Sequence, residues 1–194
     1  MKISKKIKIF ILSLVFMLVP SLALAADEGQ IVGVDSQVSA YLIGNEETGE
    51  IFYQKDAETP YPIASMSKLM TYLVTKEAMD EGKAPGYSHL GLTERDKFTV
   101  EELLNGIMVV SGNDCAVALA EAVAGSEAKF VRLMNQKAEE LNLSSQAYYN
   151  ASGLQTDNDN QNTSSAIDLF KLCQVIIKKY PEVLDYASIR KIED

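Results

Sequence analysis

The sequence has little histidine, cysteine or basic charge, and each shortage argues against a class of function. Its 194 residues contain one histidine, two cysteines and no tryptophan. A zinc site usually takes about four Cys or His ligands, so we expect no metal. Acidic residues number 27 against 18 basic ones, and no basic stripe follows the first ten residues. This balance argues against nucleic acid as a partner.

The few histidine and cysteine side chains carry further information. His89, the single histidine, lies in a segment rich in Gly, Pro and charge, which disfavours a Ser-His-Asp triad. Cys115 and Cys173 both fall within apolar helical patterns. The sequence leaves open a disulfide or two buried thiols, and the apolar context favours the thiols.

The first 25 residues have the composition of an export signal. A positive start is followed by an apolar run and by a small-x-small site: Lys2, Lys5, Lys6 and Lys8, then Ile9–Val19, then Ala23–Ala25. Because this apolar run is shorter than the roughly 20 residues that span a bilayer, cleavage after Ala25 is favoured over a retained anchor. We therefore expect an exported protein that acts outside the cytoplasm.

The remaining residues, 26–194, predict one α+β domain in which helices predominate. Runs 38–43 and 50–54 flank a polar turn and predict a β-hairpin. Residues 81–97 predict a surface loop, and residues 150–162 an irregular polar stretch.

Apolar periodicity and capping residues predict five helices. They should cover residues 65–79, 99–110, 115–124, 126–141 and 165–179. Thr99 and Glu102 have capping-box spacing, Gly125 is typical of a helix end, and Pro181 stops the last helix. One hairpin is not stable as a sheet by itself.

Ser65-Met66-Ser67-Lys68 places a hydroxyl and an amine three residues apart at the start of the first helix. That spacing puts Ser65 and Lys68 on one face, where the amine could take the hydroxyl proton. Lysine serves as a base only when desolvation lowers its pKa, and the Met and Leu neighbours predict such an environment. The alternative is a helix-capping serine beside a solvated lysine.

Ser111-Gly112-Asn113 interrupts the pattern between two apolar helices. It predicts a hydroxyl and an amide where polar groups need partners. A simple helix-to-helix turn would use the same residue types, so that interpretation stays open.

In combination, three segments resemble the D-alanyl-D-alanine carboxypeptidases of the S11 type. They are Pro62–Thr71, Met108–Ala120 and Asn150–Leu154. The resemblance implies a serine β-lactamase/transpeptidase-like fold, in which a helical cluster packs on an antiparallel sheet, and no cofactor. It implies Ser65 as the acylated nucleophile, Lys68 as proton acceptor, Ser111 as proton relay and Asn113 as substrate ligand. The expected partners are peptidoglycan stem peptides ending in D-Ala-D-Ala, with β-lactams as inhibitors.

The sequence departs from that family in one respect. The family's third motif, Lys-Thr-Gly, binds the substrate carboxylate, and no lysine after residue 113 is followed by Thr-Gly or Ser-Gly. We therefore expect a partial domain that lacks the C-terminal strands of the sheet. The alternatives are a penicillin-binding fragment without turnover and a β-lactamase-like enzyme that shares the Ser-x-x-Lys motif.

Overall fold

The structure is a computed structural model that describes residues 36–84, 87–89, 97–155 and 160–189. The predicted export signal lies outside the described residues. Within them, no helix combines the length and the apolar character needed to cross a membrane.

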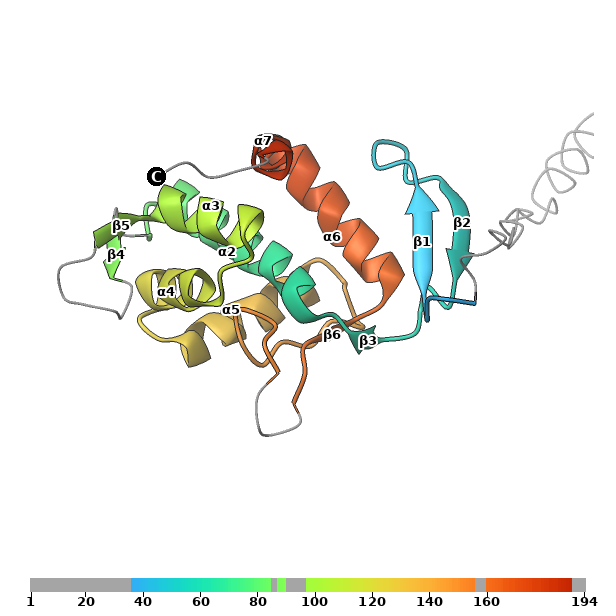
Figure 1. Cartoon of the computed structure of the whole chain (residues 1–194), viewed down its shortest axis with the longest axis horizontal. Coiled ribbons are helices and arrows are strands. Elements are labelled where there is room, and N and C mark those ends of the chain that lie inside the picture. Colours follow the sequence, from blue (N-terminus) through green and yellow to red (C-terminus); the bar gives the residue numbers. More distant parts are fainter. Residues whose placement is uncertain (1–35, 85–86, 90–96, 156–159, 190–194) are drawn as a thin grey trace, which may run out of the picture.

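A cluster of helices forms the body of the molecule (Figure 1). In chain order they are α2 (Lys68–Asp80), α3 (Val100–Val109), α4 (Asn113–Ala124), α5 (Glu127–Glu140), α6 (Ala166–Lys179) and α7 (Val183–Ser188). Helix α2 is central, since it contacts α3, α4, α5 and α6. Its side chains Met70, Tyr72 and Leu73 are fully buried. The apolar face of α2 therefore supports the whole cluster.

Helix boundaries follow the local signals closely. The capping box is confirmed, because the Glu102 N–H donates to Thr99 Oγ1 at 3.1 Å and the Thr99 N–H donates to Glu102 Oε2 at 2.7 Å. Gly125 ends α4 in the left-handed region at φ 74°. The α5 and α6 helices begin after Ser126 and Ser165, whose hydroxyls accept from backbone N–H groups in the first turn. These short-range interactions are encoded within a few residues of sequence.

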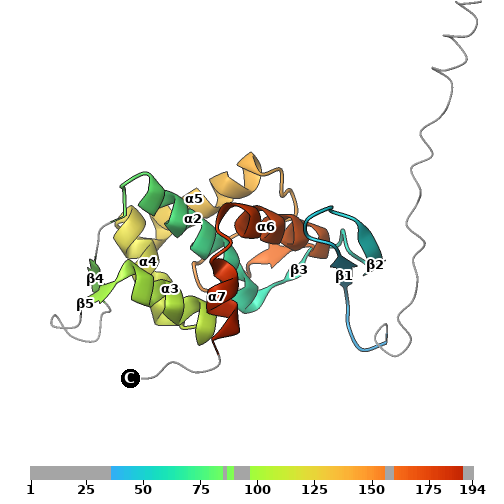
Figure 2. The same ribbon diagram turned by 90° about the horizontal axis from the view of Figure 1, so that it is seen from above.

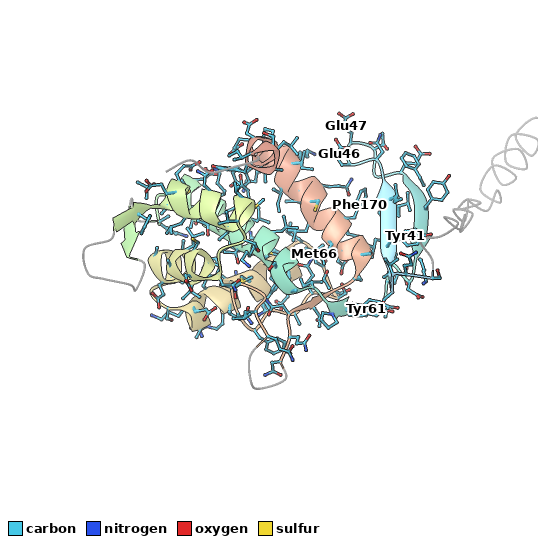
Figure 3. All side chains as sticks on the ribbon, viewed as in Figure 1. Tyr41, Glu46, Glu47, Tyr61, Met66 and Phe170 are labelled. Atoms are coloured by element: carbon cyan, nitrogen blue, oxygen red, sulfur yellow. The ribbon has the colours of Figure 1, made fainter. Side chains whose placement is uncertain are left out.

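The predicted hairpin is confirmed, with shifted ends. Strand β1 (Tyr41–Gly44) pairs antiparallel with β2 (Ile51–Lys55), and Tyr41 lies opposite Lys55. Helix α6 separates the hairpin from the other helices, as the turned view in Figure 2 shows. A Cβ on Gly44 would come within 3.0 Å of the Phe170 ring, so β1 lies directly against α6. Phe170 is labelled at this junction in Figure 3.

The remaining elements differ from the sequence-based predictions in three respects. The predicted loop at 81–97 contains a short strand, β4 (Tyr87–His89), which pairs with β5 (Lys97–Thr99) at the end of that segment. A second pair, β3 (Tyr61–Pro62) with β6 (Thr163–Ser164), joins segments far apart in sequence, where no periodicity signals it. The short helix α7 was not predicted either.

Candidate active site

The segment before α2 forms a tight turn that presents Ser65. Residues Ala64–Ser67 adopt one turn of 3₁₀ helix, η1, and α2 begins only at Lys68, so the predicted helical start at Ser65 is wrong in detail. Ala64 has φ 44°, which turns the chain sharply into η1. Ser65 is exposed, and the neighbouring Met66 side chain is 49% exposed. The turn therefore presents its hydroxyl to solvent.

Lys68 lies directly behind that hydroxyl and is almost completely buried, with 2% of its surface exposed. Its Nζ lies 3.2 Å from Ser65 Oγ, 2.8 Å from Asn113 Oδ1 and 2.8 Å from the Ser152 carbonyl oxygen. Burial lowers the pKa of Lys68 below its ordinary value, opposed by the coulombic interaction with Cys115. The sequence predicts that Met66 helps to enclose the amine, but this side chain is exposed and other groups bury the lysine.

In the structure Lys68 Nζ donates to all three of these neighbours. A neutral amine has two N–H donors and one lone pair. The two carbonyl oxygens, of Asn113 and Ser152, accept hydrogen bonds only and so take the two N–H groups. In that form the lone pair is left for Ser65 Oγ, whose O–H can donate to it. The arrangement can therefore move the Ser65 proton to Lys68 as the hydroxyl attacks.

Asn113 reaches Lys68 from the first residue of α4. The chain approaches this helix tightly, because a Cβ on Gly112 would lie 3.0 Å from Cys115 Sγ and 3.4 Å from the Gly106 carbonyl oxygen. The Gly112 N–H donates to that same carbonyl at 3.0 Å. This close packing of α3 against the start of α4 fixes the position of the Asn113 amide.

Ser111 differs from its expected setting. The sequence predicts a hydroxyl enclosed between helices, whereas Ser111 is exposed and adopts φ 56°. Among the described residues no hydrogen bond joins it to Ser65 or Lys68. The structure thus brings together Ser65, Lys68 and Asn113, while Ser111 stays on the solvent side of the turn before α4.

Sequence reasoning missed the groups that surround Lys68 from the far side. Residues 150–162 were expected to be a polar, irregular stretch, yet Asn150, Ser152 and Asn162 are 6%, 4% and 2% exposed. Ser152 binds Lys68 through its backbone carbonyl oxygen, so the identity of its side chain does not predict this contact. Gly153, at φ 79°, is the one local hint of a close backbone approach.

In the described part of the chain, neither a cluster of metal ligands nor a disulfide accompanies the site. No group of three His, Cys, Asp or Glu side chains gathers there in a way that could hold a metal ion. Cys115 and Cys173 are free thiols, so the disulfide that the sequence left open is not formed, and both are only partly buried. Burial raises the pKa of both thiols.

A serine hydroxyl beside a desolvated lysine amine, completed by an asparagine from a second helix, is the arrangement of serine acyl-transfer enzymes that use lysine as the base. Comparison with known proteins specifies the family. The model of the S11 peptidases, D-alanyl-D-alanine carboxypeptidase, matches residues 30–86 and 81–194, and the chain belongs to this family.

Individual relatives agree with this assignment. The D-alanyl-D-alanine carboxypeptidase DacF of Bacillus subtilis is 38% identical over 167 residues, covering 79% of this chain and 40% of its own length. DacD of Salmonella typhimurium is 30% identical over 209 residues, covering 96% of this chain and 53% of its own. The chain therefore spans about half the length of these curated relatives.

Solved structures show the same fold. Penicillin-binding protein 6B of Escherichia coli superposes with a TM-score of 0.76 at 27% identity, over 88% of this chain and 58% of that one. Penicillin-binding protein D2 of Listeria monocytogenes in its cefotaxime-bound form gives 0.71 at 30% identity, over 80% and 68%. The predicted transpeptidase-like α+β fold is confirmed.

Proposed function

We propose that this chain carries the acylation site of a serine-type D-Ala-D-Ala carboxypeptidase, which removes the terminal D-Ala from peptidoglycan stem peptides. The observation that carries the proposal is the buried Lys68 amine, which donates hydrogen bonds to two carbonyl oxygens and lies 3.2 Å from the exposed Ser65 hydroxyl. Membership of the S11 family supports the choice of substrate. The proposal includes export directed by residues 1–25, because peptidoglycan lies outside the cytoplasm.

The reaction proceeds in two steps, acylation of Ser65 and hydrolysis of the ester. Ser65 Oγ attacks the carbonyl carbon of the penultimate D-Ala while its proton passes to Lys68, and the oxyanion is stabilised by N–H groups that include that of Ser65. The peptide C–N bond then breaks, a proton reaches the leaving amine through Ser111, and D-Ala departs. Water hydrolyses the ester on Ser65, which releases the shortened peptide and restores the hydroxyl.

Asn113 has two tasks in this proposal. Its Oδ1 holds one N–H of Lys68, and its amide NH₂ group is left to bind the substrate's amide carbonyl. β-Lactams would acylate the same serine, because their strained amide presents a similar carbonyl. Penicillin-binding protein D2 of Listeria monocytogenes has been solved with cefotaxime and with ampicillin bound, which supports this expectation.

A fluorescent penicillin tests the acylation step directly. We expect covalent labelling of the chain, loss of the label in Ser65→Ala, and retention of it in Ser144→Ala, an exposed serine on the loop after α5. Equal labelling of the chain and of Ser65→Ala would place the nucleophile elsewhere. Release of D-Ala from a diacetyl-Lys-D-Ala-D-Ala peptide then separates a carboxypeptidase from a penicillin-binding chain without turnover.

A further inference from the structure

Asn162 lies between the turn that carries Ser65 and the loop that covers Lys68. Its Nδ2 donates to Ser67 Oγ at 2.9 Å and to the Asn150 carbonyl oxygen at 2.9 Å. Its Oδ1 accepts from the Tyr149 N–H at 2.7 Å and from the Asn150 N–H at 3.3 Å. Asn162 is 2% exposed, and the nitrogen and the oxygen of its side-chain amide both have hydrogen-bond partners.

The same residue also holds the other side of the turn through its backbone. The Ile63 N–H donates to the Asn162 carbonyl oxygen at 3.0 Å. Ser67 Oγ, which accepts from the Asn162 side chain, donates in turn to the Ala64 carbonyl at 2.7 Å. Asn162 is therefore bonded to the residues on both sides of Ser65 and to the loop at Asn150.

Asn150 gives that loop its shape. Its Oδ1 accepts from the Gly153 N–H at 2.6 Å and from the Ser152 N–H at 3.2 Å, and its Nδ2 donates to the Leu154 carbonyl at 2.8 Å. These bonds close residues 150–154 into a compact turn. The turn directs the Ser152 carbonyl oxygen toward Lys68 Nζ.

We propose that Asn162 is a positioning residue for Lys68, because by tying Ser67 to Asn150 it holds the Ser152 carbonyl on the lysine amine. Only an amide of this length meets the requirement at a buried position, since one end must donate twice and the other accept. An aspartate would add charge beside the amine, and an apolar residue would leave Ser67 and Asn150 without partners.

This role has a measurable consequence for Lys68. Burial lowers the pKa of this amine, and the loop held by Asn162 helps to bury it, because the Ser152 carbonyl oxygen lies 2.8 Å from Nζ. The titratable group that acts on it electrostatically is Cys115 of α4, to which the Asn162 side chain makes no hydrogen bond. Loosening the loop admits water, which stabilises the ammonium form and raises the pKa of Lys68.

The experiment follows the ¹³Cε shift of Lys68 against pH in ¹³C-lysine-labelled protein, with the signal assigned by its absence in Lys68→Met. We expect the Lys68 pKa to rise by about one unit or more in Asn162→Ala and in Ser67→Ala. The double variant should shift it no further than either single change, because both remove the same bridge.

Asn135→Ala is the matched control. Asn135 makes a similar pair of bonds to the segment just before that loop, with the Tyr148 N–H at 2.9 Å and the Tyr148 carbonyl at 2.8 Å, and has no hydrogen bond to the loop itself or to the Ser65 turn. It should lower stability and leave the Lys68 pKa within a few tenths of a unit. An unchanged Lys68 pKa in folded Asn162→Ala, or an equal shift in Asn135→Ala, would overturn the proposal.

The two proposals can fail separately. If Asn162→Ala does not fold, the smaller change Ser67→Ala decides alone, since an unshifted Lys68 in that variant contradicts the bridge. The inference uses the proposed function only in taking Lys68 as the base. A chain that fails to react with penicillin, yet shows the Lys68 shift, would refute the acylation chemistry and retain the positioning role.

Discussion

Gly153 packs directly on the carbonyl of Ala64, the residue before the proposed nucleophile. A Cβ built on Gly153 would overlap the Ala64 carbonyl oxygen and come within 2.8 Å of Ser67 Oγ. Gly153 also has φ 79°, in the left-handed region that favours glycine. Two independent constraints therefore require glycine here, and they allow the loop that binds Lys68 to lie against the Ser65 turn.

Gly153→Ala should destabilise the protein by about 2–4 kcal/mol, because overlap with backbone atoms adds to the cost of the positive φ. Gly82→Ala is its control, since Gly82 has φ 66° and nothing within 4 Å of an added Cβ. That variant should lose only about 1 kcal/mol. Urea unfolding measures both, and equal losses would show that the contact with Ala64 contributes nothing.

The lowered pKa of Lys68 predicts how labelling by a fluorescent penicillin depends on pH. Only the neutral amine can accept the Ser65 proton, so the rate should rise with pH and level off. The midpoint should lie below 10.5, the ordinary value for lysine. Lys68→Met should label about 10²–10⁴ times more slowly, without this rise. A midpoint at or above 10.5 would contradict the role of the desolvated amine.

Gly106→Ala should disturb the start of α4. A Cβ on Gly106 would lie 2.5 Å from Cys115 Sγ, so the sulfur and the helix that carries Asn113 must move. We expect a loss of about 1–3 kcal/mol and slower penicillin labelling.

Removing the sulfur tests this explanation. In the double variant Gly106→Ala with Cys115→Ala, the new methyl group occupies the vacated space, and both stability and labelling should recover in large part. Double-mutant analysis of thermal unfolding and labelling rates measures the coupling between the two sites. Strictly additive effects would show that the two residues do not compete for space.

Asp168 should make stability depend on acid. Burial raises its pKa, but hydrogen bonds from the Ser145 side chain and backbone and from Lys171 outweigh this, so the pKa lies below its ordinary value of 3.8. A carboxylate with a depressed folded-state pKa stabilises the protein above the unfolded-state pKa, and that contribution is lost as pH falls through the folded-state value.

Asp168→Asn should therefore cost about 2 kcal/mol at pH 7, since it removes hydrogen bonds to a charged group. The difference from the unmodified chain should shrink as the pH falls below about 4. Asp185→Asn, at an exposed position in α7, should change stability by less than about 0.5 kcal/mol. A pH-independent difference for Asp168→Asn would contradict the assigned charge.

The sequence predicts those parts of the fold whose cause is local. The Thr99 and Glu102 capping box and the Gly125 helix end each depend on a few neighbouring residues, and the structure confirms them. Ser65 and Lys68 are likewise three residues apart, so helical geometry alone brings them together. Their proximity needs no knowledge of the rest of the chain.

The other parts depend on contacts that no local pattern encodes. Pairing of β3 with β6 joins residues 61–62 to 163–164 through two residues on each side, too few for an alternating pattern. Asn162 resembles any loop asparagine in sequence, and its burial follows only from the docking of two distant segments. The backbone carbonyl of Ser152 has no side-chain signature at all.

The two carbonyl acceptors of Lys68 also determine the stage of folding at which the site can become reactive. They come from residues 45 and 84 positions further along the chain, so both ends of a long loop must close before the amine is enclosed. In a partly folded chain Lys68 is hydrated and protonated, and Ser65 has no base. Covalent capture of penicillin would therefore count only molecules whose long-range structure is complete, and it could time the folding of newly made chains.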